Sequence, residues 1–487
     1  MIPRTDMAAL LPILLPCAGG VWILVQVALM QRRTLRAGAA LALLFLGVSA
    51  AATVMLLGRG APGEVLSGAL LIDGRALVFH LIFVAVAMLT VLVSVAHLES
   101  QDAGHGEFYA LLLFAVAGMT TMAASENLLT LFLGLEVLSI PLYALAGFTR
   151  DRVYSIEAAL KYFLLGAFST GFVLYGIAFL YGATGRIDLT GIASAVSANS
   201  GAGDPLLLAG AGLLLVGLAF KVAAVPFHFW APDVYQGALA PVAGFMATGT
   251  KAAAFAMLLR IVTVGLDAAP IRARWVPVVS ALAILSMVLG NLIALAQQNI
   301  KRMLAYSSIA NAGYLLVALA AVGTNGSGAE SIYFYLAIYG FMTVGAFAVA
   351  AIIGRADEGD QGFALSAYAG LGRRRPFLAA AMALFMLSLT GIPPAAGFMA
   401  KFYIFRDAVH AGLIPLAAIG LLASVIGAFY YLRVIVQMYF REPAPEAGMA
   451  PLTLTAADAV ALTLAAVAIL YFGVIPSGLL NLARLAG

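Results

Sequence analysis

Long apolar runs separated by short polar segments dominate the sequence. About 20 mostly apolar residues are enough for a helix to cross a bilayer. We predict fourteen such helices, at approximately 7–30, 37–57, 76–97, 108–124, 127–148, 158–182, 205–225, 238–262, 276–297, 303–322, 331–353, 377–409, 411–440 and 456–475. Loops are predicted near 183–204 and 354–372. The pattern is typical of an all-α polytopic membrane protein.

Two of the runs are interrupted by proline. Pro226 breaks the seventh run, which continues as a short segment near 227–236, and the twelfth is broken at Gly391-Ile392-Pro393-Pro394. Proline has no backbone N–H, so a helix must kink or stop there. Inside a membrane, such a break is tolerated only beside protein or water.

The two interrupted runs suggest an internal repeat. Each carries one lysine close to its break, Lys221 before the first and Lys401 after the second. Interrupted helices at corresponding places in two halves indicate an ion site in transporters. Within a single membrane domain, 1–487, we therefore expect three N-terminal helices in 1–100, repeats in 108–262 and 276–440, and a last helix in 456–487.

Composition narrows the class of protein. Of the 487 residues, 63% are hydrophobic and 10% charged, against about 25% charged in soluble domains. The apolar runs are continuous rather than alternating, which excludes a transmembrane barrel. Cys17 is the single cysteine, too few for an iron–sulfur cluster with four thiolates. The first run has no clear cleavage site and is predicted to be a retained helix.

Basic residues set the expected orientation, since cytoplasmic loops are enriched in Lys and Arg. Loops after odd-numbered helices carry Arg32, Arg33, Arg36, Arg150, Arg152, Lys301, Arg302, Arg355, Arg373, Arg374, Arg375 and Arg441. The other face carries Arg4, Arg59, Arg75, Arg186, Arg272, Arg274 and Arg484. The bias predicts a bacterial inner-membrane protein with both termini in the periplasm. The net charge of +4 is small and lies in short loops, so we expect no nucleic-acid partner.

Lysine is used unusually in this chain. Only five lysines stand against 21 arginines, and four of the five lie inside or at the edge of apolar runs: Lys161, Lys221, Lys251 and Lys401. We place Lys301 in a loop. Arginine stays protonated in proteins, whereas a buried lysine can exchange its proton near neutral pH. The pattern favours proton movement, with snorkelling or structural pairing of these lysines as the alternative.

Glu136 is the one acidic residue that we place in the middle of an apolar run. A carboxylate at that depth should be neutral or paired, and Lys221 is its expected partner. Separating such a pair would release the proton of the lysine. A purely structural ion pair is the alternative.

The histidines give less information. His228 lies beside the first break and could join a water chain or make a structural hydrogen bond. His80, His97, His105 and His410 are interpreted as solvated residues at helix ends or in loops. Their spacing indicates no metal site, and the sequence contains no dinucleotide or phosphate-binding loop.

Five stretches of the chain carry a family resemblance. They are Glu136–Phe148, Ser155–Thr170, Phe220–Gly237, Asn299–Tyr314 and Ser388–Tyr403. Through them the chain resembles the antiporter-like membrane subunits of bacterial respiratory complex I, the proton-pumping NADH:quinone oxidoreductase, and is most similar to subunit N. Subunit M carries a glutamate where Lys401 stands.

The resemblance implies a fold and a set of residue roles. The fold has fourteen helices, two inverted five-helix repeats, and broken seventh and twelfth helices. Glu136 and Lys221 match the family's paired glutamate and lysine, Lys251 its connecting lysine and Lys401 its terminal lysine. Lys161 matches a lysine of the sixth helix whose role is open.

The implied function is proton translocation without redox chemistry in this chain. We expect no bound cofactor or metal here, and flavin and iron–sulfur clusters in partner subunits of complex I that reduce quinone with electrons from NADH. A subunit of a multi-subunit sodium/proton antiporter and a scaffold subunit are the alternatives.

Overall fold

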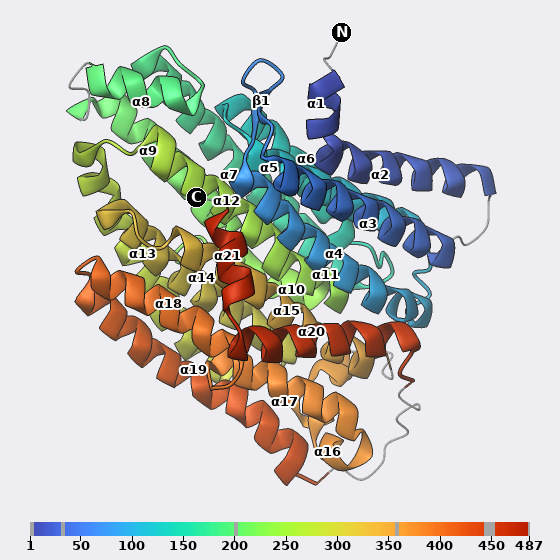
Figure 1. Ribbon diagram of the computed structural model, residues 1–487. Coiled ribbons are helices and arrows are strands. Elements are labelled where there is room, and N and C mark those ends of the chain that lie inside the picture. The colour runs from blue at the N-terminus through green and yellow to red at the C-terminus, as the bar shows by residue number, and fades with distance from the viewer. Residues whose placement is uncertain (1–3, 31–34, 199–202, 356–359, 443–452, 486–487) are drawn as a thin grey trace.

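The computed structural model describes residues 4–30, 35–198, 203–355, 360–442 and 453–485. In this part of the chain, twelve helices are long and apolar enough to cross a membrane. Two interrupted helices bring the number of spans to fourteen, as predicted: α9 (Pro205–Lys221) with α10 (Trp230–Gly237), and α17 (Pro376–Thr390) with α18 (Ala396–His410). The helices run roughly side by side as a slab (Figure 1). The predicted loop basic residues Arg32 and Arg33 lie outside the described residues.

The N-terminal part contains three spans and a small hairpin. Its elements are α1 (Arg4–Ala9), α2 (Leu11–Met30), α3 (Leu35–Arg59), β1 (Gly63–Val65), β2 (Leu70–Ile72) and α4 (Gly74–Ser100). The hairpin pairs Gly63 with Ile72, and Gly68 at its tip has a φ of +80°. Asp73 caps α4 by accepting from the Ala76 N–H at 2.9 Å. The hairpin was not predicted, since its strands are only three residues long.

The next five spans contain the first break. Their elements are α5 (Glu107–Ala124), α6 (Leu128–Ala146), α7 (Val153–Thr184), α8 (Leu189–Ala198), α9 (Pro205–Lys221), α10 (Trp230–Gly237), α11 (Ala240–Phe245), η2 (Met246–Thr250), α12 (Lys251–Arg260) and η3 (Ile261–Gly265). The eighth span is continuous from Ala240 to Gly265, with π-helical turns at η2 and η3. The predicted loop at 183–204 contains the short helix α8, so that expectation was wrong over Leu189–Ala198.

The following five spans contain the second break. Their elements are α13 (Ala269–Ala296), α14 (Ile300–Asn325), α15 (Ala329–Gly354), η4 (Asp360–Phe363), η5 (Leu365–Tyr368), α16 (Leu371–Arg374), α17 (Pro376–Thr390), α18 (Ala396–His410) and α19 (Ile414–Phe440). The predicted loop at 354–372 contains the short helical turns η4 and η5 and the start of α16. These turns are too short to leave a periodic signal in the sequence.

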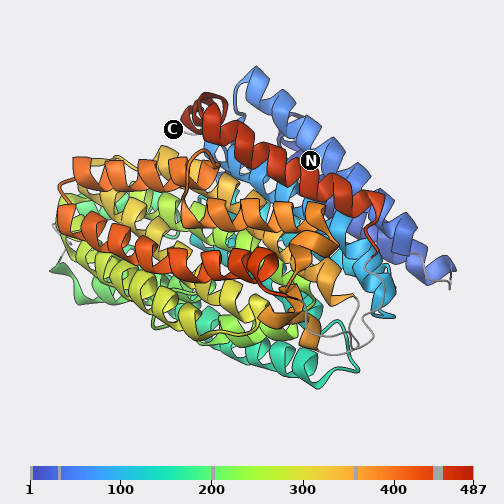
Figure 2. The same ribbon diagram turned by 90° about the horizontal axis from the view of Figure 1, so that it is seen from below.

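The last span, α20 (Ala456–Val474), is followed by α21 (Ser477–Arg484). The red α20 lies on the same face of the slab as the blue N-terminal helices (Figure 2) and packs on α4 and α15. Arg355 reaches Asp458 of α20 with both guanidinium nitrogens, at 2.6 and 2.7 Å. An ion pair thus connects the last span, α20, to the end of α15.

Both predicted breaks are present. α9 ends at Lys221, ahead of the cis bond Val225–Pro226, and α17 ends at Thr390, ahead of the cis bond Pro393–Pro394. Gly391 has a φ of +89°, a left-handed conformation that glycine adopts without strain. At the first break the Trp230 indole donates to the Phe220 carbonyl at 3.0 Å, and the Val225 N–H donates to Ser286 Oγ at 2.9 Å. Side chains therefore satisfy backbone groups that the missing helical turn leaves free.

Candidate functional site

Lys221 is the last residue of α9 and is only 3% exposed. Its Nζ donates to Ser139 Oγ of α6 at 2.7 Å. The Tyr143 and Tyr162 rings lie 5.6 and 5.5 Å from the same atom. The ammonium group is therefore held by a hydroxyl and two aromatic rings.

Glu136 does not form the expected direct ion pair with Lys221. Ser139 lies three residues after Glu136, about one turn along α6, and it takes the place next to Lys221 Nζ. No oxygen of Glu136 lies within the 4.0 Å ion-pair limit of Lys221, and its buried Oε1 has no hydrogen-bond partner among the described residues. The expected direct contact is therefore absent from this structure because the Ser139 hydroxyl lies next to Nζ, while the charge of Glu136 still acts on Lys221 through space.

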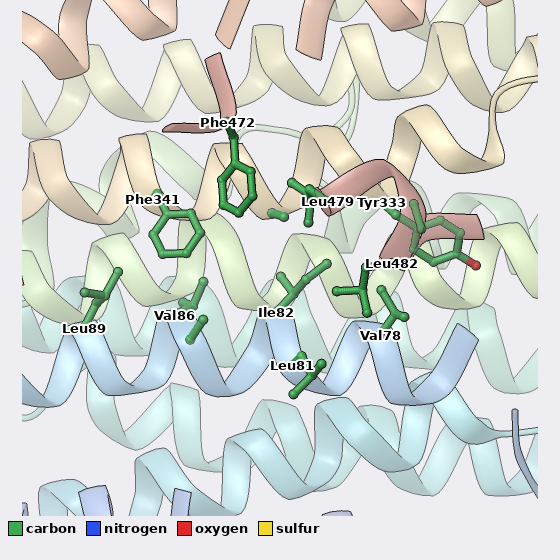
Figure 3. Close-up of a pocket in the computed structure, with 13 residues that line it drawn as sticks. Val78, Leu81, Ile82, Val86, Leu89, Tyr333, Phe341, Phe472, Leu479 and Leu482 are labelled. Carbon is green, nitrogen blue, oxygen red and sulfur yellow. The ribbon is translucent and has the colours of Figure 1, made fainter. Parts of the chain in front are cut away.

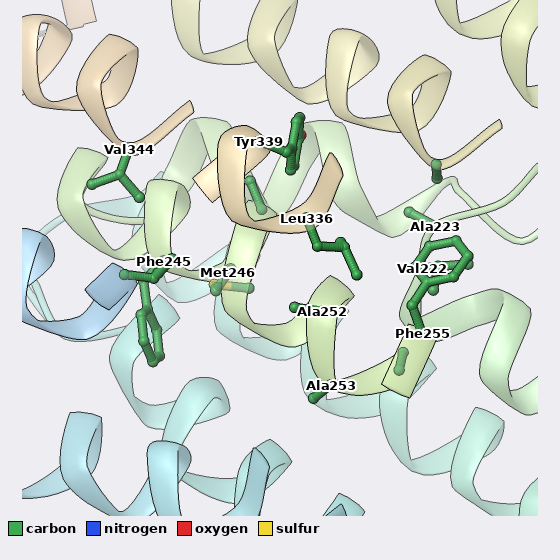
Figure 4. Close-up of a cluster of buried hydrophobic side chains, with 14 of the residues drawn as sticks. Val222, Ala223, Phe245, Met246, Ala252, Ala253, Phe255, Leu336, Tyr339 and Val344 are labelled. Carbon is green, nitrogen blue, oxygen red and sulfur yellow. The ribbon is translucent and has the colours of Figure 1, made fainter. Parts of the chain in front are cut away.

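Lys251 begins α12, directly after the π-helical turn η2, and is 1% exposed. Its Nζ donates to Ser308 Oγ of α14 at 2.7 Å and also to the Ser308 carbonyl. The Tyr339 ring of α15 lies 5.6 Å away. Figure 4 shows the apolar surroundings of this helix, where Ala252 lies near Leu336 and Phe255 extends toward Val222 and Ala223 of the first break. An ammonium group here has a few fixed oxygen partners inside an apolar core.

Lys401 lies in the first half of α18, beyond the second break, and is 7% exposed. Its Nζ donates to the carbonyls of Leu389 and Thr390, at 2.9 and 3.0 Å, and to Ser424 Oγ at 2.8 Å. The two carbonyls end α17, where the helix dipole favours a positive charge. The break in the twelfth span therefore builds the binding place of this lysine.

These three lysines share a property that the sequence did not reveal. Within the described residues, no carboxylate lies within ion-pair distance of Lys221, Lys251 or Lys401, and their hydrogen-bond partners are hydroxyls and carbonyls. A nearby carboxylate would favour the charged form of a lysine, whereas neutral oxygens hold it less firmly. The arrangement is suited to lysines that gain and lose protons.

Lys161 differs from them. Its side chain is 40% exposed, and Nζ lies 2.6 Å from both Glu157 and Asp233. Asp233 also pairs with Arg302 at 2.6 Å. Lys161 therefore belongs to a partly exposed ion cluster, separate from the three buried lysines.

A polar stripe on α14 connects the surroundings of Lys251 and Lys401. Beyond Ser308, Asn311 Nδ2 donates to the Ser307 carbonyl at 2.8 Å, and Asn311 Oδ1 accepts from the Tyr335 hydroxyl. Ser307 Oγ lies 2.5 Å from the Tyr431 hydroxyl. The centroid of the Tyr314 ring lies 5.0 Å from Lys401 Nζ. The same stripe continues outside α14, where Asn291 Nδ2 donates to the Tyr314 hydroxyl and Asn291 Oδ1 accepts from Tyr430.

Sequence reasoning missed this stripe. Ser307, Asn311 and Tyr314 recur at intervals of four and three residues, which places them on one face of a helix. Polar residues with that spacing in an apolar run were the available signal.

Several other residues lie where the sequence did not place them. Lys301 was predicted in a loop, but it is a buried residue in the first turn of α14 and donates to the Ala238 carbonyl at 3.0 Å. His80 and His97 were predicted to be solvated, but both are buried in α4. His80 bonds to Ser49 and Thr120, each at 2.8 Å, and His97 to the Ala351 carbonyl at 3.1 Å. Tertiary packing covers these positions, and local sequence does not reveal it.

His228 leaves its two predicted roles open. It is 7% exposed, lies 4.6 Å from the Phe229 ring, and has a buried Nδ1 without a hydrogen-bond partner among the described residues. Metal binding has no support in the described residues, where no group of three or more His, Cys, Asp or Glu side chains could hold an ion.

A buried charge cluster lies at the helix ends opposite to those that carry the Lys161 cluster. Arg260, at the end of α12, pairs with Asp73 at 2.8 Å and with Glu126 at 3.4 Å. Glu126 is in the loop between α5 and α6, and burial raises its pKa in spite of the nearby Arg260 guanidinium. This cluster was not predicted from the sequence, because its members come from three separate loops and helix ends.

Comparison with known proteins identifies the family. A family model described as NADH:quinone oxidoreductase/Mrp antiporter, transmembrane, matches residues 125–427. NADH-quinone oxidoreductase subunit N of Trichlorobacter lovleyi is 48% identical over 441 residues, covering 91% of this chain and 89% of that protein.

Solved structures agree with this assignment. A chain of respiratory complex I from Thermus thermophilus is 37% identical with a TM-score of 0.80, and the match covers 96% of this chain and 98% of that one. A chain of the Mrp complex from Dietzia sp. DQ12-45-1b has a TM-score of 0.85 over 99% and 97% of the two chains but only 22% identity, and so shares the fold. The resemblance seen in the sequence is thereby confirmed. The chain belongs to the NADH:quinone oxidoreductase/Mrp antiporter family of membrane subunits and groups there with subunit N.

Proposed function

We propose that this chain carries protons across the membrane through Lys221, Lys251 and Lys401, as subunit N of an NADH-quinone oxidoreductase. The observation that carries the proposal is the neutral oxygen environment of three buried ammonium groups. Moving a proton onto or off such a lysine breaks no direct ion pair. The relatives' name supplies the setting, since they are NADH-quinone oxidoreductase subunits.

The polar stripe on α14 supports transfer between the second and third lysines. Ser308 contacts Lys251 and Tyr314 contacts Lys401, and the two are six positions apart on the helix. At 1.5 Å per residue the two contacts lie about 9 Å apart along the helix. Waters together with the Ser307, Asn311 and Tyr431 side chains would bridge that length.

Glu136 is proposed to adjust Lys221 through space and through the shared Ser139. The roles of Lys161 and His228 are minor parts of the proposal. The ion pairs of Lys161 favour a structural role at the edge of the chain, and His228 would join a water chain beside the break.

The decisive test is the Lys221→Ala variant in the intact complex. In proteoliposomes driven by NADH, we expect proton pumping to fall at least several-fold while the complex still assembles, because the buried proton carrier is gone. Arg272→Ala, which removes an arginine in the first turn of α13 paired with Asp267 at 3.3 Å, is the matched control and should pump normally. Normal pumping by an assembled Lys221→Ala complex would remove Lys221 from the mechanism.

A scaffold role makes a different prediction for Glu136→Gln. This variant keeps the size and hydrogen-bonding capacity of the side chain and removes its charge. A subunit whose charges only hold helices together should function normally with it, whereas the proposed mechanism expects reduced pumping.

A subunit of a multi-subunit sodium/proton antiporter is the second candidate, favoured by the fold shared with the Mrp complex chain. Co-purification separates the two. Flavin and iron–sulfur subunits in the purified complex support the first candidate, in which those cofactors lie in partner subunits and none in this chain. Sodium/proton exchange without those subunits supports the second.

The proposed placement is the bacterial inner membrane, with both termini in the periplasm and two inverted repeats over 108–262 and 276–440. Reporter fusions after α21 test the orientation. An alkaline phosphatase fusion should be active there, and a fluorescent-protein fusion should be dark.

A further inference from the structure

One cavity of the molecule differs from the others in its lining. It has a volume of about 280 Å³ and lies among His97, Gln101, Arg152, Gln236 and Lys301. These residues come from the end of the third span, the start of the sixth, the end of the seventh and the start of the tenth, on the face predicted to be cytoplasmic. Two other cavities are lined almost wholly by apolar side chains, one of them between α4, α15, α20 and α21 (Figure 3). The polar side chains in the lining of the first cavity provide hydrogen-bond partners for water there.

His97 places a proton acceptor in this cavity. Its Nδ1 lies 3.1 Å from the Ala351 carbonyl. A carbonyl oxygen only accepts, so the network assigns the proton of the neutral ring to Nδ1. Nε2 is left with its lone pair and has no hydrogen-bond partner among the described residues, although the residue as a whole is 2% exposed. A histidine with one fixed and one open nitrogen is suited to passing protons.

The surroundings of His97 favour short residence of a proton. Burial of the ring disfavours its charged form most, and the nearby cations Arg355, Lys301 and Arg152 act in the same direction. A proton that arrives at Nε2 is therefore repelled and passed on rather than stored.

The helix α14 connects the wall of the cavity with a contact of a buried lysine. Lys301 lines the cavity, donates to the Ala238 carbonyl at 3.0 Å and lies 4.1 Å from the Phe363 ring. Ser308, the hydrogen-bond partner of Lys251, lies seven residues after Lys301 on α14. Two helical turns, about 10 Å, separate the cavity wall from that contact.

We propose that this cavity is the proton-uptake vestibule of the subunit and that His97 is its relay. Nε2 takes a proton from water at the cytoplasmic face, becomes the imidazolium, and returns the proton from Nε2 to water on the Lys251 side. Only N–H bonds form and break. The inference rests on the proposed function and adds to it an uptake site and a proton-relaying residue.

Labelling tests whether the vestibule is hydrated. Cys17 is the single cysteine, so Cys17→Ser gives a background without thiols. In that background, Thr149→Cys lines the polar cavity and Ala85→Cys lines the apolar cavity of Figure 3. A membrane-impermeant sulfonate thiol reagent added to inside-out vesicles should label Thr149→Cys within minutes and leave Ala85→Cys unlabelled. Failure to label Thr149→Cys in the assembled complex would overturn the vestibule.

Substitution tests the relay. His97→Gln keeps a donor for the Ala351 carbonyl and cannot carry a proton, so pumping per NADH oxidised should fall several-fold. Free imidazole in the buffer should restore much of it through the open cavity. His80→Gln is the matched control, since His80 bonds to Ser49 and Thr120 and lines none of the three cavities. Any defect of that variant should not respond to imidazole.

The outcomes separate the two proposals. Normal pumping by His97→Gln together with loss of pumping in Lys221→Ala would overturn the relay and leave the proposed function standing. Normal pumping by Lys221→Ala would overturn the proposed function, whatever the labelling shows. Loss in both variants, with imidazole rescue confined to His97→Gln, is the result expected.

Discussion

At the scale of single residues, the group that a lysine contacts matters more for its ability to exchange a proton than how deeply the lysine is buried. Lys221 and Lys161 lie in neighbouring spans, yet the first bonds to a serine hydroxyl and the second to two carboxylates. Opposite charges hold a lysine protonated, and neutral oxygens leave it free to titrate. The same residue type can therefore serve as a proton carrier at one position and as a structural pair at another.

Two acidic loop residues should respond to pH with opposite sign. Burial raises the pKa of Glu126, so its contribution to stability is present at low pH and is lost as pH rises through the raised value. The hydrogen bond from Arg186 lowers the pKa of Asp188, so its contribution is present above the ordinary carboxyl pKa and is lost on acidification.

The thermal midpoint of the purified complex, measured from about pH 3 to about pH 7, checks this expectation, because that range lies on both sides of the ordinary carboxyl pKa of about 4. As pH rises, the thermal midpoint of Glu126→Gln should increase relative to that of the wild type. Over the same range, the thermal midpoint of Asp188→Asn should decrease relative to that of the wild type. Parallel pH profiles for both variants would contradict the assignment.

At the scale of elements, glycine sets how closely spans approach. A Cβ on Gly118 of α5 would lie 2.3 Å from the Leu138 backbone nitrogen of α6, and a Cβ on Gly290 of α13 would lie 2.7 Å from the Ala310 nitrogen of α14. Both pairs are the first two spans of a proposed repeat. Small residues allow such backbone contact where helices pack in lipid.

Gly118→Ala should therefore destabilise the subunit. Backbone atoms cannot rotate away as a side chain can, so α5 and α6 must separate, at a cost of about 1–3 kcal/mol. The control is Gly171→Ala in α7, where a Cβ meets nothing within 4 Å; better helix propensity should leave it neutral or slightly more stable. Thermal inactivation of the assembled complex measures both. Equal stability of the two variants would contradict the close packing of α5 on α6.

At the scale of the whole molecule, distant parts of the chain are held by few buried charges. Asp458 is fully buried, accepts two hydrogen bonds from Arg355, and also completes the capping box of α20 with Thr455. This pair fixes the last span against the end of α15.

Asp458→Ala should loosen the last span. It leaves the Arg355 guanidinium, 6% exposed, without its counter-charge, and breaking a buried pair in this way costs about 3–5 kcal/mol. The control is Glu330→Ala, whose pair with Arg484 at 3.6 Å is exposed and worth less than about 1 kcal/mol. The thermal midpoint of the complex should fall markedly only for Asp458→Ala. A similar small change for both variants would show that α20 is held in place by apolar packing alone.

The sequence by itself determined the number of spans, the two breaks and the lysines beside them. These features are local, since bilayer thickness fixes the length of an apolar run and proline removes a backbone donor wherever it stands. The family resemblance added the identity of the subunit, and comparison confirmed it.

Only the tertiary structure decided which partner each charge has. Ser139 rather than Glu136 meets Lys221, and Lys301 and His97 are buried rather than solvated. The stripe of Ser307, Asn311 and Tyr314 turns inward to Tyr431 and Asn291. Partners such as these come from different elements of the fold, from 23 to 254 residues apart along the chain. Apolar periodicity in a membrane helix does not say which face is inward, because lipid and protein interior are equally apolar.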